Sequence, residues 1–217
     1  MGVAPGGVMT RQLLILVAAL SGALLTLPSH AAADVGEGPS LEGYFIGGFA
    51  GQYRLRVDGE RMEDRDLDLD PTLGGGIRLS LGHVFRFGLM AEFRGYGSSD
   101  SDYSDRDFAF DLSPFIGLRF PLAESDDTAL FLRGIVPFGY TRLAPDDQRF
   151  GDDSYHGFNT GLLGGLGVAF GNIGIFADVG VRYHRVYAKT DLGPFGDVRS
   201  SLGWAQLSVN AGMAAHF

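Results

Sequence analysis

The sequence predicts an all-β fold in which eight antiparallel strands close into an up-and-down barrel. Eight short segments alternate apolar residues with small or polar ones, which is the period of a strand with two unlike faces. The connections between these segments alternate between long and short. Beyond the first 33 residues, no stretch approaches the roughly eighteen apolar residues that indicate a membrane-spanning helix.

Each of the first four strands has one apolar face. Their ranges are Tyr44–Val57, Leu73–Leu81, Phe85–Tyr96 and Phe108–Phe120. The apolar faces hold Phe45, Phe49, Tyr53, Leu55 and Val57 in the first; Leu73, Ile77, Leu79 and Leu81 in the second; Phe87, Leu89, Ala91 and Phe93 in the third; and Phe108, Phe110, Leu112, Ile116, Leu118 and Phe120 in the fourth. The third strand shows the cleanest alternation, because charged residues and Met90 fall between its apolar positions.

The last four strands follow the same rule. Their ranges are Ala129–Arg142, Gly157–Phe170, Ile173–Tyr187 and Ser201–Phe217. The fifth carries Leu130, Leu132, Val136, Phe138 and Tyr140 on one face; in the eighth, steps of two back from Phe217 give Ala215, Met213, Ala211, Val209, Leu207 and Ala205. Every predicted strand reaches the roughly 9–11 residues that a tilted strand needs to cross the hydrocarbon of a membrane.

The connections predict that one end of the barrel carries long loops and the other carries short turns. The long, polar ones are Asp58–Thr72, Gly97–Asp107, Leu143–His156 and Lys189–Ser200, and the short ones are Gly82–Val84, Pro121–Thr128 and Gly171-Asn172. Membrane barrels with an even number of strands show this alternation, with both termini at the short-turn end.

The composition of the non-apolar face predicts that this face points inward. A soluble barrel, the main alternative, would cover its outside with Lys, Glu and Thr. Here Gly, Ala, Ser and Arg dominate, as in Gly161, Gly165, Gly167 and Ala169. Small residues suit the narrow interior of an eight-stranded barrel. The apolar face would then meet lipid, with Tyr and Phe at the interfaces.

Residues 1–33 resemble a secretory signal peptide. An apolar run from Leu13 to Leu27 follows Arg11 and leads into small residues that suit cleavage. Met9 is an alternative start, and a retained membrane anchor is the alternative reading. We expect a periplasmic lead over 34–43 and the barrel over 44–217.

Composition excludes several functions. The chain has 217 residues, which suits one domain, and no Cys, so disulfides and thiolate sites are excluded. A formal net charge of -9 argues against nucleic-acid binding. We expect no cofactor and no metal site, because the acidic run Asp66–Asp70 lacks the Gly and the terminal Glu of a calcium-binding loop.

Two segments carry a resemblance to a known family. Residues 43–51 read Gly-Tyr-Phe-Ile-Gly-Gly-Phe-Ala-Gly, and residues 211–217 read Ala-Gly-Met-Ala-Ala-His-Phe. The mature chain resembles the small eight-stranded bacterial outer-membrane β-barrels, namely the transmembrane domain of outer membrane protein A and opacity-type proteins. The resemblance implies an outer-membrane location in a Gram-negative cell envelope, periplasmic termini, extracellular long loops, a monomeric state and contact with lipid and lipopolysaccharide. It also implies that the barrel-assembly machinery reads the closing residues Val209, Ala211, Met213, Ala215 and Phe217.

The inward face predicts a charge network in the barrel lumen. Its members by strand parity are Arg54, Arg56, Arg78, Arg86, Glu92, Arg94, Asp111, Arg119, Arg133, Asp178 and Arg182. Arginine suits confined ion pairs because its planar guanidinium donates several hydrogen bonds. Two interpretations remain open: a structural plug of ion pairs and water, or an anion-preferring pore, since the cations outnumber the carboxylates.

The remaining polar residues predict no catalytic site. His184 and Asp178 share a strand but lie six residues apart, about 20 Å along it. Ser154 and His156 are near neighbours in a loop, which is not the geometry of a catalytic triad. Acidic residues crowd the first three long loops and are candidates for contact with an extracellular partner. The expected function is therefore structural or surface-interactive, with a narrow porin-like channel as the alternative and a lipid A-modifying enzyme as a weaker one.

Overall fold

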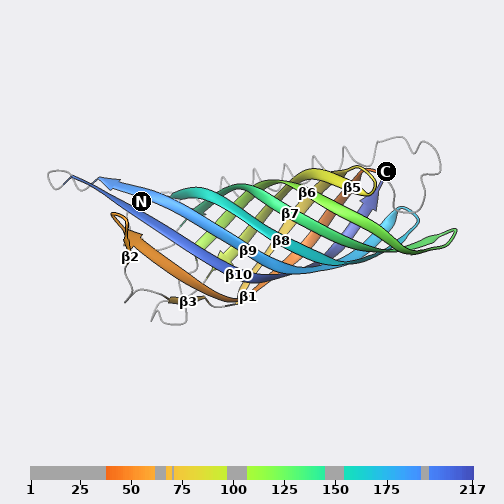
Figure 1. The fold of residues 1–217 in the computed structure, drawn as a ribbon, viewed down its shortest axis with the longest axis horizontal. Helices are drawn as coiled ribbons and strands as arrows, with labels where there is room; N and C mark the ends of the chain where they lie inside the picture. The colour runs from red at the N-terminus through yellow and green to blue at the C-terminus, as the bar shows by residue number, and fades with distance from the viewer. Residues whose placement is uncertain (1–37, 62–66, 70, 97–106, 145–153, 192–195) are drawn as a thin grey trace, which may run out of the picture. The chain divides into compact units, whose positions relative to one another are not determined.

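A computed structural model describes residues 38–61, 67–69, 71–96, 107–144, 154–191 and 196–217. Within them the chain is all β, and eight strands close into a ring because β1 pairs with both β4 and β10 (Figure 1). The predicted eight-stranded antiparallel up-and-down barrel is confirmed. The ring strands are β1 (Ser40–Val57), β4 (Thr72–Leu81), β5 (Phe85–Tyr96), β6 (Asp107–Glu124), β7 (Thr128–Ala144), β8 (Tyr155–Phe170), β9 (Ile173–Asp191) and β10 (Asp197–His216).

Two short strands, β2 (Glu60–Arg61) and β3 (Leu67–Leu69), extend the sheet beside β1. They lie in the segment predicted as the first long loop. Asp58 and Gly59 have φ angles of 49° and 87° and make the two-residue turn from β1 to β2. This turn needs a left-handed backbone at both positions, which an Asp-Gly pair adopts readily.

The strands are longer than predicted, mainly at the loop end. The pairing of β9 with β10 begins at Asp191 and Asp197. Much of the expected loop 189–200 is therefore part of a hairpin, which projects beyond the other strands (Figure 1). At the other end β1 starts at Ser40, inside the expected lead 34–43, and pairs with Ser80 and His216. Only β5 has the predicted bounds.

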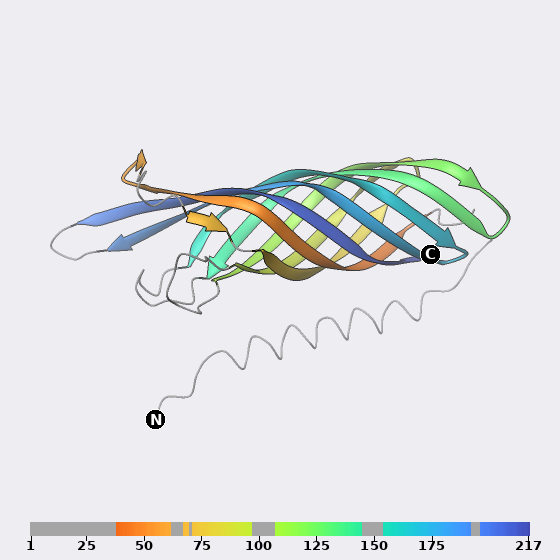
Figure 2. The same ribbon diagram turned by 90° about the horizontal axis from the view of Figure 1, so that it is seen from below.

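The short connections gather at the end of the barrel where β10 ends (Figure 2). Gly171 (φ 55°) and Asn172 link β8 to β9, with Phe170 paired to Ile173. The backbone N–H of His216 donates to the carbonyl oxygen of Asn172 at 2.8 Å, which fixes the end of β10 beside this turn. We call this the turn end, and the opposite one the loop end.

A β-bulge in β1 changes which residues face the interior. Phe49 pairs with Leu207, but Gln52 pairs with Ala205, so two β1 residues oppose one β10 residue. The extra residue inverts the alternation beyond this point. Leu55 therefore pairs with Leu202, which packs in the interior, and its predicted place on the lipid face is wrong.

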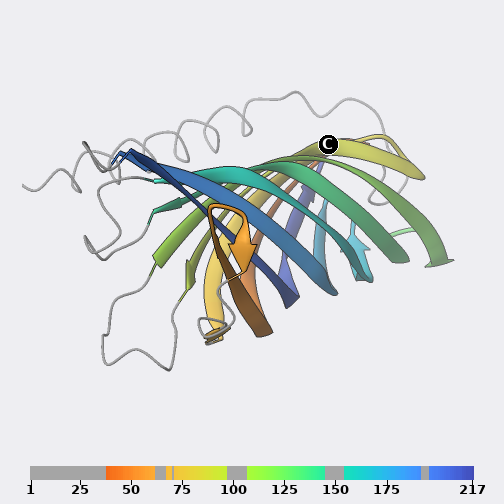
Figure 3. The ribbon, with the colours of Figure 1, turned by 60° about the vertical axis from the view of Figure 1, so that its left-hand side comes forward.

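The outer surface is a belt of exposed apolar side chains. On β9 they are Ile173, Ile175, Val179 and Val181, all at least half exposed, and Phe45 on β1 is 82% exposed. The strands slant steeply across the barrel (Figure 3). From Ile173 to Tyr183, ten residue steps at a tilt near 40° rise about 26 Å, which matches the apolar band of a membrane barrel. The described residues include no helix long and apolar enough to span a membrane.

Candidate functional site: the charged barrel interior

The barrel interior holds two clusters of buried charge. The turn-side cluster consists of Glu42, Arg78, Arg133 and Asp178, and the loop-side cluster of Glu92, Arg94, Asp111, Arg182 and His184. All of these side chains are less than a tenth exposed. They come from β1, β4, β5, β6, β7 and β9, whose inward residues follow the period of two.

In the turn-side cluster two arginines and two carboxylates form a closed ring of ion pairs. Glu42 Oε2 lies 2.9 Å from Arg78 Nη1 and 2.7 Å from Arg133 Nη2. Asp178 completes the ring, with its Oδ2 at 3.3 Å from Arg78 Nη1 and its Oδ1 at 3.0 Å from Arg133 Nε. Because four different strands supply these groups, the ring ties opposite walls of the barrel together.

Aromatic rings also lie against the guanidinium groups at this level. The Arg78 guanidinium carbon lies 4.9 Å from the centroid of the Tyr44 ring, and that of Arg133 lies 4.2 Å from the Phe176 ring. Arg119, nearer the turn end, stacks at 3.8 Å on Phe131. Cation–π contacts of this kind stabilise a guanidinium without a carboxylate. The surplus of positive charge is therefore compensated in part by the barrel itself.

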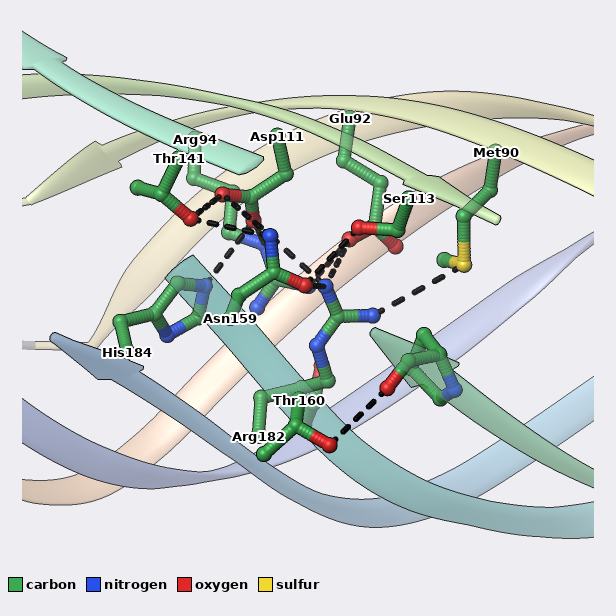
Figure 4. Close-up of polar contacts among 12 residues, drawn as sticks. Met90, Glu92, Arg94, Asp111, Ser113, Thr141, Asn159, Thr160, Arg182 and His184 are labelled. Atoms are coloured by element: carbon green, nitrogen blue, oxygen red, sulfur yellow. Dashed lines mark hydrogen bonds and ion pairs between the residues drawn. The ribbon is translucent and has the colours of Figure 1, made fainter. Parts of the chain in front are cut away.

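Asp111 is the centre of the loop-side cluster (Figure 4). Its Oδ2 lies 2.9 Å from His184 Nε2, and its Oδ1 accepts a hydrogen bond from the Thr141 hydroxyl at 2.5 Å. Arg182 Nη2 lies 3.6 Å from Asp111 Oδ2 and 3.0 Å from Glu92 Oε2. Arg94 donates from Nη2 to Glu92 Oε2 at 2.8 Å.

Neutral polar groups complete the loop-side cluster. Asn159 accepts hydrogen bonds at Oδ1 from the Ser113 hydroxyl at 2.8 Å and from Arg182 Nη2 at 2.9 Å. Its amide nitrogen donates to the Thr141 hydroxyl at 2.9 Å. Tyr44 donates from its hydroxyl to Glu92 Oε1 at 3.0 Å, so this residue contacts both clusters.

Apolar layers fill the rest of the interior. One joins the two charged clusters and contains Tyr44, Ile46, Met90, Phe115, Ile135, Leu163 and Phe176. Another closes the loop end of the described barrel with Tyr96, Ala109, Leu143, Tyr155, Val186 and Trp204. Trp204 stacks on His184 with 4.7 Å between ring centroids, so this layer lies directly on the charged one.

The interior leaves almost no open volume around the turn-side cluster. A cavity of about 20 Å³ lies beside Glu42, Arg78, Arg86 and Arg133. A single water needs about 10–15 Å³ by this measure, so the cavity holds about one. The described side chains therefore form a plug in the barrel.

Inward glycines on β8 make room for the charged side chains. A Cβ atom on Gly161 would lie 2.6 Å from the Val181 carbonyl oxygen and 2.7 Å from Arg182 Cδ, and one on Gly165 would lie 2.0 Å from the Ala177 carbonyl oxygen and 2.6 Å from Asp178 Oδ1. Outward-facing Gly164, by contrast, has only the Arg133 carbonyl oxygen near, at 3.8 Å. Gly161 and Gly165 are thus required by the close approach of the β9 backbone and of the charged side chains that β9 carries.

The structure brings nine of the eleven predicted lumen residues into the interior and leaves two outside. The nine are Arg78, Arg86, Glu92, Arg94, Asp111, Arg119, Arg133, Asp178 and Arg182. Arg54 and Arg56 are exposed, because the bulge in β1 turns them outward. Their placement in the lumen is corrected accordingly.

Sequence reasoning missed Glu42 and Asn159. Glu42 fell in the expected lead, although its parity with Tyr44 and Ile46 indicates an inward position. His184 faces inward on the same strand as Asp178 but too far along it for contact, and its carboxylate partner is Asp111 on β6. Strand parity cannot predict such a pair, because the partner lies across the barrel.

The other predicted residues have simple positions. Val209, Ala211 and Met213 face outward on β10, Ala215 is half-buried, and Phe217 follows the strand; their role in assembly stays a prediction. Most of the acidic loop residues lie outside the described residues, namely Glu63, Asp64, Asp66, Asp70, Asp100, Asp102, Asp105, Asp146, Asp147, Asp152 and Asp153.

The described residues provide no catalytic arrangement of serine and histidine. Ser154 accepts a hydrogen bond from Arg142 Nη2 at 3.0 Å, whereas His156 Nδ1 lies 2.5 Å from the Tyr140 hydroxyl. The His184–Asp111 pair is buried beneath Trp204, and Ser113 donates to Asn159 instead. Among the residues with a described position, no group of three or more His, Asp or Glu side chains is arranged to hold a metal ion.

Fold and interior together define an eight-stranded membrane-type β-barrel with a filled lumen. No protein-family model matches the chain, and no curated protein matches its sequence. Among solved structures, the outer membrane protein OprG from Pseudomonas aeruginosa is 12% identical, with a TM-score of 0.56 over 86% of this chain and 99% of that chain. Neisserial surface protein A is 14% identical, with a TM-score of 0.44 over 83% and 100% of the two chains. The chain therefore has the fold of the small outer-membrane β-barrel proteins.

Proposed function

We propose that this protein is an integral outer-membrane barrel whose role is structural or surface-interactive rather than conductive. The observation that carries this proposal is the plug of ion pairs, hydrogen bonds and apolar layers in the lumen. A solute would have to break buried ion pairs to pass, which would leave buried charges uncompensated.

The proposed orientation places the loop end outside the cell and the turn end in the periplasm. Long connections gather at the loop end, as in bacterial outer-membrane barrels, where they face the exterior. A protein in this orientation would present its acidic loops to an extracellular partner. Added protease should cleave within the segment 58–72 on intact cells, whereas protection of this segment until the outer membrane is opened would reverse the orientation.

Planar-bilayer recording tests the non-conductive role. The purified barrel should insert without giving reproducible current steps. Reproducible, anion-preferring steps would support the second candidate function, a narrow channel for small anionic solutes. That candidate rests on the excess of arginine over carboxylate in the lumen.

Two variants make the test sharper. Arg94→Ala and Arg133→Ala each remove a lumen cation, one from each cluster. If the barrel is a pore, both substitutions should lower its preference for anions. If the barrel is plugged, currents from the folded variants should stay at the background of the lipid alone.

A lipid-modifying activity remains a weaker candidate, since the described residues offer no nucleophile beside a general base. Mass spectrometry of lipid A from cells with and without expression should show the same species. A new acylated or deacylated species that depends on expression would favour the enzyme.

A further inference from the structure

The cationic side chains of this barrel divide into two sets. Twelve Lys and Arg residues have described side chains, and six of them lie inside the lumen. The other six, Arg54, Arg56, Arg142, Arg185, Lys189 and Arg199, all face outward near the loop end, on β1, β7, β9 and β10. We call this second set the basic strip.

Strand register places the members of the basic strip next to one another. Gly203 on β10 pairs with Arg54 on β1 and with Arg185 on β9, so these two arginines flank it. Two residues further toward the loops, Ser201 pairs with Arg56 on one side and Tyr187 on the other.

The neighbouring positions extend the same surface. Arg199 pairs directly with Lys189, and Arg142 on β7 pairs with His156 on β8. Figure 1 shows β1, β10 and β9 side by side where they approach the loop end.

The strip has small residues along its middle and long side chains along its borders. Gly203 and Ser201 on β10 carry little or no side chain, whereas the neighbouring positions on β1 and β9 carry arginines and Tyr187. Adjacent strands lie about 4.8 Å apart, so the backbones of Arg54 and Arg185 are about 10 Å apart. Next to this shallow channel a hollow of about 570 Å³ is lined by residues of the strip and its neighbours, among them His156, Tyr187, Lys189 and Arg199.

Among the described residues, few carboxylates neutralise the strip. Lys189 pairs with Asp197 at 2.5 Å, and Asp58 accepts a hydrogen bond from the backbone N–H of Arg199. No described carboxylate lies within ion-pair distance of the guanidinium groups of Arg54, Arg56, Arg185 or Arg199. In a chain with a net charge of -9, this concentration of positive charge indicates an anionic ligand.

The position of the strip relative to the apolar belt indicates which kind of anion it binds. On β9 the apolar belt ends at Val181, Tyr183 follows at the aromatic interface, and Arg185 is the next outward residue. The strip therefore starts where hydrocarbon gives way to lipid headgroups. Arginine binds phosphate through paired hydrogen bonds, and arginines on both sides of β10 suit a headgroup with phosphates at opposite ends.

We propose that the basic strip binds the bis-phosphorylated disaccharide headgroup of the outer-leaflet glycolipid, with its acyl chains against the apolar belt of β9, β10 and β1. This inference rests on the proposed orientation, because only then does the strip face the glycolipid leaflet. The wall from β4 to β6, which continues the sheet beyond β1, has no outward Lys or Arg among its described residues. Binding would thus occur on one side of the barrel.

The test measures binding of purified bis-phosphorylated lipid A to the refolded barrel in detergent micelles by native mass spectrometry. Dephosphorylated lipid A, phosphatidylglycerol and inorganic phosphate serve as comparison probes. Bis-phosphorylated lipid A should bind at least about tenfold more tightly than each of the three, because each lacks one part of the paired-phosphate glycolipid. Equal binding of phosphatidylglycerol or of dephosphorylated lipid A would overturn the proposal.

Substitutions then locate the binding surface. The double variants Arg54→Gln/Arg56→Gln and Arg185→Gln/Arg199→Gln should each weaken binding by about tenfold or more. Ser201→Asp, which adds a negative charge in the centre of the strip without removing a contact, should weaken it comparably. Lys189→Arg keeps the charge and should bind as the natural chain does.

A matched control removes a cation elsewhere. Arg86→Gln deletes one positive charge from the turn end of the lumen, away from the strip. Every variant is first checked by its heat-dependent migration in a gel, so a folding defect is recognised before binding is measured. Undiminished binding in both folded double variants would refute the basic strip as the binding site. The closed barrel and its orientation would be unaffected, because bilayer recording and protease cleavage test them separately.

Discussion

Replacement of Asp111 should destabilise the barrel more than loss of any exposed ion pair. Asp111→Ala removes the partner of His184 at 2.9 Å, the acceptor of the Thr141 hydroxyl at 2.5 Å and a charge 3.6 Å from Arg182. Arg94 and Arg182 are then left to share Glu92, at 2.8 and 3.0 Å. Removing one partner of a buried ion pair typically costs 3–5 kcal/mol, and we expect a loss in this range.

The single tryptophan of the chain provides the assay. Trp204 is 1% exposed and stacks on His184, so its fluorescence reports whether the barrel is folded. Urea titration of the refolded protein in detergent gives the unfolding midpoint and the slope, from which the change in unfolding free energy follows. The midpoint is used rather than the intensity, because the substitution also changes the surroundings of the indole ring.

Two further variants serve as comparisons. Asp111→Asn keeps the size of the side chain and an oxygen for Thr141 but loses the charge, so its effect should lie between those of the natural chain and Asp111→Ala. Asp197→Ala removes the Lys189 pair, whose side chains are 59% and 45% exposed, and should cost at most about 1 kcal/mol. If Asp111→Ala shifts the unfolding free energy no more than Asp197→Ala does, the buried network is not what stabilises the interior.

Three further predictions concern the lumen and the fold. Gly165→Ala places a Cβ 2.0 Å from the Ala177 carbonyl oxygen and 2.6 Å from Asp178 Oδ1 and should cost about 1–3 kcal/mol in urea titration, whereas Gly164→Ala beside it has space and should be nearly neutral; equal effects would contradict the packing argument. Glu42→Ala leaves Arg78 and Arg133 with Asp178 alone and should cost about 3–5 kcal/mol in urea titration, and a folded variant as stable as the natural chain would show that Glu42 does not hold the ring of ion pairs together. Unboiled protein should migrate differently from boiled protein in a detergent gel, and identical migration would count against a closed barrel.

The sequence alone predicts most of the barrel, because alternation and loop length are local signals. Phe85–Tyr96 is predicted to the residue, since Arg86, Met90, Glu92 and Arg94 alternate with the apolar residues of its outward face. The β1 bulge lies in Ala50-Gly51-Gln52. Small residues there give no apolar signal, so the sequence does not show that the inward and outward positions exchange. Strict alternation along β1 is correct up to Phe49 and therefore predicts the wrong face for Arg54 and Arg56.

The pairings inside the lumen could not be predicted in the same way. Parity indicates that Asp111 and His184 both face inward, but their contact depends on the stagger of the closed sheet, which no single strand encodes. The same holds for Arg78 and Asp178, from strands that do not pair with each other. The sequence therefore predicts which charged residues face the lumen, but their pairing depends on how the closed sheet places the strands.

The distribution of charge decides which arginines are free to serve a ligand. Arg78 and Arg133 already contact carboxylates and aromatic rings, so these two lumen cations are compensated within the protein. Arg54 and Arg185 flank a glycine on the outer surface with no described carboxylate in ion-pair distance. A buried cation needs a carboxylate or another partner within the fold, whereas an exposed cation at the membrane interface stays solvated and can bind a lipid phosphate. The positive charge available for recognition therefore lies on the outside of the barrel wall, which separates the structural use of arginine in this protein from its use in binding.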